Sequence, residues 1–145
     1  MLLYLDVEAL PDSDFYYLIG VRVKTAEGFV HHSFWADEPD GMAKLWADFL
    51  NLLATVYNPC LVHYGSFETT FLKRMTALLG GPSSNAVGVV RAIEHSVNLL
   101  STIRSQVCLP TFSNGLKEIA NALGFRWSEE DASGCVHSIC SSHRN

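Results

Sequence analysis

The amino-acid sequence predicts an α/β fold, with a mixed sheet of three antiparallel strands and one parallel strand flanked by helices. Two observations support this prediction. First, three strand-like segments follow one another at the N-terminus, within residues 1–8, 15–24 and 29–35. Second, the apolar period then changes from two to 3.6 residues, and a short apolar run at residues 60–64 lies between amphipathic helices. Three strands, a helix, a further strand and then helices form a layered sheet with helices packed against it.

The first predicted strand, Met1-Leu-Leu-Tyr-Leu-Asp-Val-Glu8, ends in two carboxylates one residue apart. Successive side chains of a strand point to opposite faces, so Asp6 and Glu8 share one face. Two carboxylates at the end of a covered strand cost free energy through desolvation and repulsion, and a divalent cation would offset that cost. Mg²⁺ and Mn²⁺ select carboxylate oxygens, and a spacing of about 6–7 Å along a strand suits two ions held side by side. The alternative is a solvated strand end that binds no metal.

The next segments predict a β-hairpin and then a helix. Residues 15–24 are rich in aromatic and β-branched side chains, residues 25–28 have the composition of a turn, and Phe29–Trp35 returns antiparallel. The acidic, proline-containing stretch at residues 37–41 suits a helix N-terminus. One face of the helix that follows is apolar and comprises Met42, Leu45, Trp46, Phe49, Leu50 and Leu53.

Residues 60–64 form an apolar run of the length expected for a buried strand, after which Gly65-Ser66 turns the chain into a second helix. Ser66 is the predicted N-cap. Glu68 then lies in the first turn, beside the positive end of the helix dipole, where the default role of a single glutamate is to stabilise the helix start. The predicted apolar stripe of this helix comprises Phe67, Phe71, Met75, Leu78 and Leu79.

The last third of the chain predicts further helices. Residues 91–104 follow one apolar face and predict a continuous helix. Residues 110–115 form a loop, and Ser113 or Asn114 is the expected cap of another helix. Beyond Trp127 the sequence becomes polar and loses its periodicity.

Length and composition limit the possible functions. A chain of 145 residues, 48% of them hydrophobic, is long enough for one domain with a core and too short for two ordinary domains. No run of about 18 apolar residues predicts a membrane helix, and the N-terminus lacks signal-peptide features, so we expect a cytoplasmic protein. The four cysteines are therefore expected to be reduced thiols. The net charge of −5 would repel a polyanion, so a nucleic-acid function must depend on a local site.

Two motifs resemble those of the DEDD 3′ to 5′ exonucleases, which have a ribonuclease H-like fold. Asp6-Val-Glu8 is similar to their first motif. His63-Tyr-Gly-Ser-Phe-Glu-Thr-Thr-Phe-Leu72 is similar to the second, in which a Phe-acid pair begins a helix, although the acid here is Glu68 rather than aspartate. Over residues 2–134 the chain also resembles the ribonuclease H-like domain of predicted RecB-family nucleases, related to the YprB type. Further segments that carry this second resemblance are Val97-Asn-Leu-Leu-Ser101, Pro110-Thr-Phe-Ser-Asn-Gly-Leu-Lys-Glu-Ile-Ala120 and Leu123-Gly-Phe-Arg-Trp127.

The resemblance implies a metal-dependent nuclease domain over residues 1–134, followed by an irregular tail over residues 135–145. It implies that Asp6, Glu8 and Glu68 are carboxylate ligands of a two-ion Mg²⁺ or Mn²⁺ centre that hydrolyses phosphodiester bonds of DNA or RNA. It also implies a RecB-like nuclease or helicase domain as a fusion or partner. The absence of a long apolar run predicts no association with a membrane.

The resemblance further implies a ligand that this sequence does not supply. Similar domains continue beyond the equivalent of Gly134 into a long helix and a Tyr-Asn-x-x-Asp-Cys segment, whose aspartate completes the metal site. Residues 135–145 do not match that pattern, so we expect a truncated or frame-shifted domain that hydrolyses nucleic acid weakly. Two other interpretations remain open: a catalytically inactive ribonuclease H-like module that binds nucleic acid or a protein, and a non-functional gene fragment.

Histidine and basic residues near the motifs have alternative roles. His63 is either a general base or a core histidine bonded to a backbone carbonyl, and its position at the end of an apolar strand favours the core role. Five basic residues are candidates for phosphate contacts, although the acidic total favours an ordinary solvated surface: Lys73, Arg74, Arg91, Lys117 and Arg126.

Overall fold

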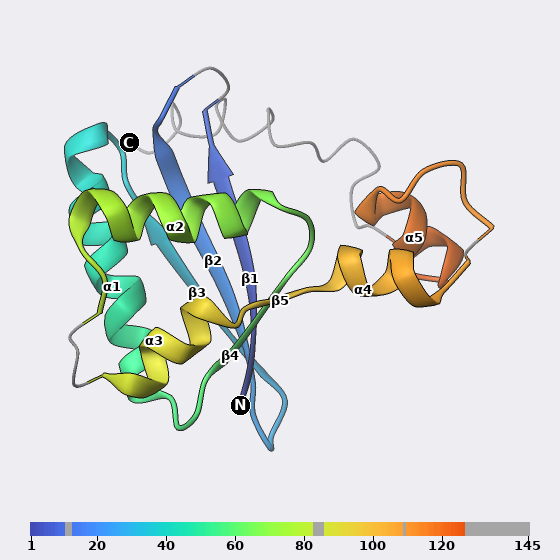
Figure 1. The fold of residues 1–145 in the computed structure, drawn as a ribbon, viewed down its shortest axis with the longest axis horizontal. Coiled ribbons are helices and arrows are strands. Elements are labelled where there is room, and N and C mark those ends of the chain that lie inside the picture. The colour runs from blue at the N-terminus through green and yellow to red at the C-terminus, as the bar shows by residue number, and fades with distance from the viewer. Residues whose placement is uncertain (11–12, 83–85, 109, 127–145) are drawn as a thin grey trace, which may run out of the picture. The chain divides into compact units, whose positions relative to one another are not determined.

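The computed structural model describes residues 1–10, 13–82, 86–108 and 110–126, and within them a five-stranded mixed sheet forms the centre of the fold. Strands β1 (Leu2–Ala9), β2 (Tyr16–Lys24) and β3 (Phe29–Trp35) are antiparallel neighbours. Strands β4 (Cys60–His63) and β5 (Val97–Asn98) join in parallel on the other side of β1, so the order across the sheet is β3-β2-β1-β4-β5 (Figure 1). The predicted α/β class and mixed sheet are confirmed, and β5 is an addition.

Helices α1 (Met42–Thr55), α2 (Phe67–Leu79) and α3 (Val87–Glu94) pack on one face of this sheet. A single 3₁₀ turn, η1 (Pro39–Gly41), precedes α1, and α4 (Leu99–Gln106) follows β5. Helix α2 follows β4 after a three-residue turn at residues 64–66 (Figure 1).

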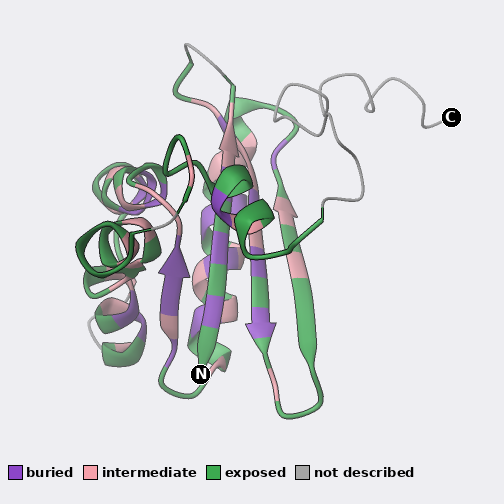
Figure 2. Cartoon of the chain, turned by 90° about the vertical axis from the view of Figure 1, so that its right-hand side faces the viewer, coloured by how far each residue is buried: buried purple, intermediate pink, exposed green. Residues whose placement is uncertain are grey.

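Residue alternation along the central strands decides which face is buried. Leu3, Leu5 and Val7 of β1 are buried, whereas Tyr4 and Asp6 between them are exposed (Figure 2). Directly paired residues of neighbouring strands share a face, and the β2 partners of these buried residues are also buried: Val23, Val21 and Ile19. One face of the sheet therefore belongs to the core, and Asp6 lies on the other.

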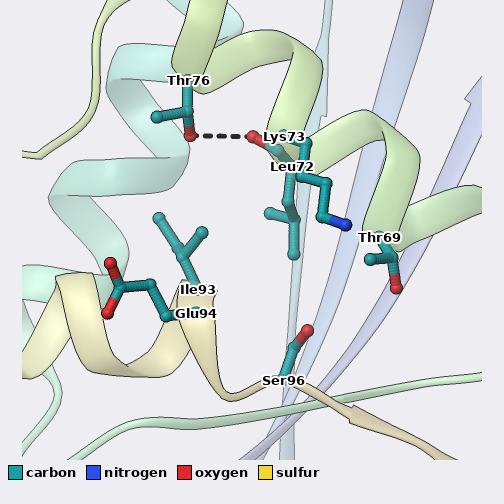
Figure 3. A pocket seen from close by; sticks show the side chains of 7 residues that line it. All are labelled: Thr69, Leu72, Lys73, Thr76, Ile93, Glu94 and Ser96. Carbon is teal, nitrogen blue, oxygen red and sulfur yellow. Dashed lines mark hydrogen bonds between the residues drawn. The ribbon is translucent and has the colours of Figure 1, made fainter.

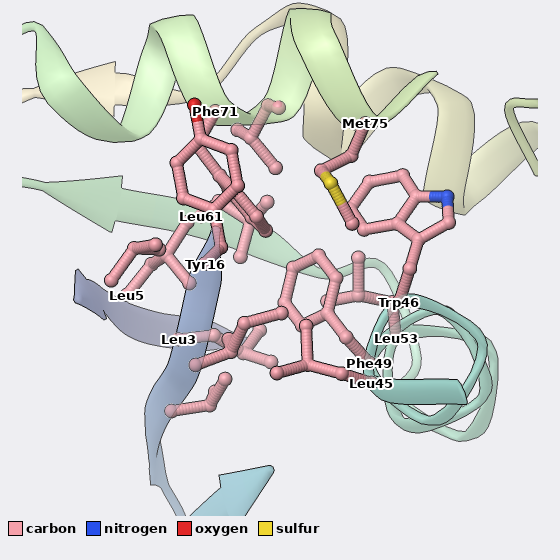
Figure 4. Packing of buried hydrophobic residues seen from close by; sticks show 14 of the residues in the cluster. Leu3, Leu5, Tyr16, Leu45, Trp46, Phe49, Leu53, Leu61, Phe71 and Met75 are labelled. Carbon is pink, nitrogen blue, oxygen red and sulfur yellow. The ribbon is translucent and has the colours of Figure 1, made fainter. Parts of the chain in front are cut away.

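Aromatic side chains join the sheet to α1 and α2. The ring of Phe71 on α2 is fully buried, with its centroid 4.9 Å from that of Tyr16 and 5.8 Å from that of Trp46 (Figure 4). Both pairs have an edge-to-face arrangement, which aromatic rings favour. Trp46 Nε1 also donates a hydrogen bond to the carbonyl of Gly80, at the end of α2. Gly80 has φ +87° and ψ 153°, a non-helical conformation that glycine adopts readily, and the helix ends there.

The buried stripe of α2 differs from the predicted one. The buried residues are Glu68, Phe71, Leu72 and Met75, which follow the i, i+3, i+4, i+7 pattern of a core-facing stripe. Phe67, Leu78 and Leu79, which the sequence pattern placed inward, are exposed. The helix is rotated so that an acid, rather than Phe67, occupies the first inward position.

The prediction of one continuous helix over residues 91–104 is wrong. Helix α3 ends at Glu94, and β5 then pairs with β4 through Val62 opposite Val97 and His63 opposite Asn98. Strand pairing satisfies backbone groups that a helix would otherwise use. The segment that the apolar spacing predicted as one helix therefore consists of α3, the short strand β5 and α4.

Ser66 occupies the N-cap position of α2, as predicted, but its side chain makes no capping hydrogen bond. Its backbone already has helical angles, φ −98° and ψ −10°, whereas an N-cap side chain needs an extended backbone to reach the helix amides. The Ser66 carbonyl instead accepts hydrogen bonds from the backbone N–H and the hydroxyl of Thr70.

A second unit, over residues 107–145, contains helix α5 (Leu116–Ala122) among its described residues. Gly115 is the N-cap of α5, not Ser113 or Asn114 as predicted. The Ser113 hydroxyl accepts a hydrogen bond from the Gly115 N–H at 3.1 Å, so it stabilises the loop rather than the helix.

Three other expectations concern the chain as a whole. In the part of the chain that the structure describes, no helix has the length and apolar character needed to cross a membrane. Of the four cysteines, Cys60 and Cys108 lie in the described residues and form no disulfide there, and Cys135 and Cys140 lie outside the described residues. The predicted irregular tail at residues 135–145 lies outside the described residues.

We expect Phe71→Ala to lower the free energy of unfolding by about 3–5 kcal/mol, because it leaves a cavity among fully buried rings. Phe67→Ala, on the same helix at a side chain that is 46% exposed, should cost less than about 1 kcal/mol. Urea denaturation of both variants measures the difference. A larger loss for Phe67→Ala would contradict the orientation of α2 in which Phe67 is exposed and Phe71 is buried.

Candidate metal centre

Asp6 and Glu8 lie on β1 beyond the last residue that pairs with β4. Tyr4 is that last paired residue, so the two acids extend alongside the turn that leads from β4 into α2. Asp6 lies on the face opposite to the buried Leu5, as alternation predicted, but that face is exposed at Asp6, so the expectation of a covered strand end is wrong for this residue. Gly20 is its partner on β2, where a Cβ atom would lie 3.8 Å from the Asp6 Cβ. The absence of a side chain at Gly20 leaves room on this face beside Asp6.

Glu68 projects from the first turn of α2 into the protein and is only 6% exposed. Its Oε2 atom is buried and has no hydrogen-bond partner. His63 Nδ1 lies 3.6 Å from that oxygen, which is beyond hydrogen-bonding distance. An unsatisfied buried polar atom costs about 1–3 kcal/mol, and more when it is charged. Glu68 is therefore not a surface residue whose only role is to stabilise the helix start.

The pKa of Glu68 is raised above its ordinary value, chiefly because burial removes water from its carboxylate. A hydrogen bond from its own backbone N–H opposes this rise, and the negative charges of Asp6 and Glu8 add to it. The pKa of Asp6 is also raised by desolvation, and a hydrogen bond from the Val7 backbone opposes this rise. Asp6 is exposed as a residue, but the surrounding protein removes part of the water from its carboxylate. Glu68 lies about 60 residues after Asp6 and Glu8 in the sequence. The fold brings it close enough for the charges of both acids to raise its pKa.

His63 is a buried, neutral histidine. Its Nδ1 lies 3.0 Å from the Gly65 carbonyl, and its Nε2 lies 3.3 Å from the Thr69 hydroxyl. A carbonyl only accepts, so we assign the proton to Nδ1, and Nε2 then accepts from Thr69. Burial lowers the pKa of His63, against the raising effect of the Gly65 carbonyl. The core-histidine interpretation is confirmed, and a neutral His63 does not compensate the charge of Glu68.

Two pockets lie near α2. A pocket of about 480 Å³ between α2 and α3 is lined by none of the three carboxylates (Figure 3). It is lined by Thr69, Leu72, Lys73, Thr76, Ile93, Glu94 and Ser96. The hydroxyl of Thr69, which lines this pocket, lies 3.3 Å from His63 Nε2. A smaller pocket of about 350 Å³ includes Ala9 and Phe67, the sequence neighbours of Glu8 and Glu68.

Two of the basic residues that were candidates for phosphate contacts, Lys73 and Arg74, have other surroundings in the structure. Arg74 forms an ion pair with Asp14, and Lys73 lines the pocket between α2 and α3. Arg22, which the sequence reasoning did not single out, lies on β2 two residues from Gly20 and therefore on the face that carries Asp6. Its guanidinium carbon is 3.9 Å from the centre of the Phe29 ring. The alternation of β2, counted from Gly20, would have identified it.

The donor set fits a hard divalent cation. All three donors are carboxylates, which Mg²⁺ and Mn²⁺ prefer. The unpartnered Glu68 oxygen and the mutual repulsion of the acids are the features that a bound cation would relieve. In the described residues, no three His, Cys, Asp or Glu side chains are already grouped around a single metal position. Binding would therefore require the carboxylates to move toward the ion.

We expect Glu68→Gln to increase stability at pH 7 in EDTA by on the order of 1 kcal/mol, or a few degrees in Tm, because it removes a buried charge. A raised pKa means that the folded state binds this proton more tightly than the unfolded chain does. The favourable contribution of protonated Glu68 is complete below the unfolded-state pKa and disappears as pH rises through the raised folded-state pKa. The variant's advantage should thus diminish in acid.

Thermal unfolding between pH 4 and pH 8 measures this effect. Glu27→Gln is the matched control, since Glu27 is exposed in the β2–β3 turn. A Glu68→Gln variant that is less stable than the wild type at pH 7 in EDTA would contradict the account of an uncompensated buried carboxylate.

Comparison with known families gives an independent result. The family model of the RNase H superfamily matches residues 3–138, which is nearly the whole chain and includes Asp6, Glu8 and Glu68. Comparisons with curated proteins and with solved structures gave no match. Together with the mixed five-stranded sheet of the described residues, the family match shows that the chain belongs to the RNase H superfamily.

Proposed function

We propose that this protein is a divalent-metal-dependent nuclease of the 3′ to 5′ exonuclease type. Its active site, formed by Asp6, Glu8 and Glu68, would hydrolyse phosphodiester bonds of a nucleic acid. The observation that carries this proposal is the buried Glu68 carboxylate, whose Oε2 has no hydrogen-bond partner. Burial raises the pKa of Glu68, and the charges of Asp6 and Glu8 raise it further. In a chain of the RNase H superfamily, the repulsion of Glu68, in the first turn of α2, by Asp6 and Glu8 of β1 is best explained by a cation between these carboxylates.

Each residue has a distinct role in this proposal. A bound Mg²⁺ or Mn²⁺ would lower the pKa of a water molecule and stabilise the charge on the leaving oxygen. Asp6, Glu8 and Glu68 would together hold this ion through their carboxylate oxygens. His63 keeps its Nδ1 proton on the Gly65 carbonyl and accepts from Thr69, so it stabilises the turn and does not remove a proton from water.

Three carboxylates supply enough protein ligands for one ion but not for two ions. Mg²⁺ takes six oxygen ligands and keeps several waters, so three carboxylates are enough for one ion, whereas a second ion needs further protein ligands. Among the described residues, the acids whose charges raise the pKa of Glu68 are Asp6 and Glu8. We therefore propose that the second ion binds poorly and that hydrolysis by this chain is slow.

The substrate and its context follow from the same reasoning. The net charge of −5 makes a local, cation-assisted site the means of binding a polyanion. The resemblance to RecB-family nucleases leads us to propose DNA or RNA as substrate, a nuclease or helicase domain as partner, and a cytoplasmic location.

A catalytically inactive module that binds nucleic acid is the second candidate. It is favoured by one observation, that no three potential ligands among the described residues are already grouped around a metal position. On this interpretation the three carboxylates would be remnants of a site, and nucleic-acid binding would not depend on a divalent cation.

We expect slow hydrolysis of end-labelled single-stranded DNA or RNA in Mn²⁺ or Mg²⁺, and none in EDTA. Asp6→Asn should reduce the rate by at least about 100-fold, the effect typical of losing one group that stabilises transition-state charge. Lys44→Gln, at an exposed position on α1, is the control. Equal rates for the wild type and Asp6→Asn would remove the site assignment, and metal-independent binding without hydrolysis would favour the inactive module.

A further inference from the structure

The turn between β4 and α2 determines where Glu68 lies. In that turn, the backbone carbonyl and the backbone N–H of Gly65 each form a hydrogen bond with a side chain. Gly65 has φ +101°, a conformation that favours glycine. Its carbonyl accepts from His63 Nδ1 at 3.0 Å, and its N–H donates to Asn98 Oδ1 at 3.1 Å. Glu68 follows three residues later, in the first turn of α2. A displacement of Gly65 therefore displaces the start of α2 and the Glu68 carboxylate with it.

Asn98 is held firmly enough to fix that turn. It lies in β5, opposite His63 of β4, so the sheet holds its backbone. Its Oδ1 also accepts from the Leu100 N–H at 3.0 Å, at the beginning of α4. A carbonyl oxygen has two lone pairs, so these two hydrogen bonds use its full acceptor capacity. The side chain consequently has one orientation that satisfies both the turn before α2 and the start of α4.

We infer that Asn98 is a positioning residue for Glu68. It acts through the Gly65 N–H and touches neither metal nor substrate, and its importance for reactivity rests on the proposed function. Removing Oδ1 leaves the Gly65 N–H without its acceptor, so the turn moves away from β5. Groups that orient metal ligands from outside the coordination sphere typically change metal affinity by about 10–100-fold when removed.

The simpler role of Asn98 is to cap α4, and one neighbouring residue separates the two roles. The Ser101 hydroxyl donates to the backbone carbonyl of Asn98 at 2.8 Å. This contact stabilises the same end of α4 and has no part in the bond to Gly65. Ser101→Ala is therefore a matched control for a purely structural effect on α4.

The experiment uses the full chain with three variants: Asn98→Ala, Asn98→Asp and Ser101→Ala. Asn98→Asp retains an acceptor oxygen at the same place and is the conservative rescue. Mn²⁺ affinity is measured by calorimetry well below the melting temperature of each variant, after circular dichroism has shown that it is folded. Amide hydrogen exchange of the metal-free proteins is the second measurement. Thr70, whose N–H donates to the Ser66 carbonyl at 3.1 Å, reports on the first turn of α2.

We expect Asn98→Ala to weaken Mn²⁺ binding about tenfold or more and to accelerate exchange at Thr70, with Asn98→Asp within about threefold of the wild-type affinity. Ser101→Ala should leave both quantities unchanged, even where it lowers the melting temperature. Wild-type affinity and exchange in folded Asn98→Ala would overturn the inference, as would an equal effect of Ser101→Ala. A wild-type protein that binds no Mn²⁺ would instead refute the proposed metal site, and exchange at Thr70 alone would then decide whether Asn98 positions α2.

Discussion

The unpartnered carboxylate oxygen of Glu68 is the constraint around which the rest of this structure is arranged. A buried oxygen without a hydrogen bond is costly, and here two further acids raise that cost. His63, whose Nδ1 lies 3.6 Å from Glu68 Oε2, gives no compensation, because burial lowers its pKa and its Nδ1 proton is bonded to the Gly65 carbonyl. The core of α1, α2 and the sheet supplies the stability that keeps Glu68 in this unfavourable position.

The sheet topology explains how residues distant in sequence meet at this point. Strand β1 is longer than its parallel neighbour β4, so its C-terminal acids extend past the end of β4. The chain leaves β4 at His63, turns at Gly65 and enters α2, which brings Glu68 to the same end of the sheet. Ligands of α/β proteins commonly bind beyond the carboxyl ends of parallel strands, since the turns into the next helices gather there. The packing of Phe71 against Tyr16 and Trp46 then holds α2 against the sheet.

Local sequence patterns predicted the strands and the acid pair well, because alternation and turn composition are local properties. The hairpin and the acidic end of β1 follow directly from residues within about ten positions of each other. The burial of Glu68 was not predictable in this way, since apolar spacing alone favoured Phe67 as the inward residue and the rotation of α2 is set by tertiary packing. Asn98 was missed for a related reason: its segment has helical spacing, yet pairing with β4 makes it a strand. Residues whose roles depend on partners far along the chain were the ones that the sequence left undetermined.

The most direct test of the central claim, that Asp6, Glu8 and Glu68 form a cation site, is a crystal structure of the protein grown in Mn²⁺ with anomalous diffraction data. We predict an anomalous peak beside Asp6, with a carboxylate oxygen of Glu68 about 2 Å from the ion. The Oε2 atom that has no hydrogen bond here would then be a metal ligand. A structure in saturating Mn²⁺ with no peak between these carboxylates, and with Glu68 bonded instead to protein groups, would contradict the account.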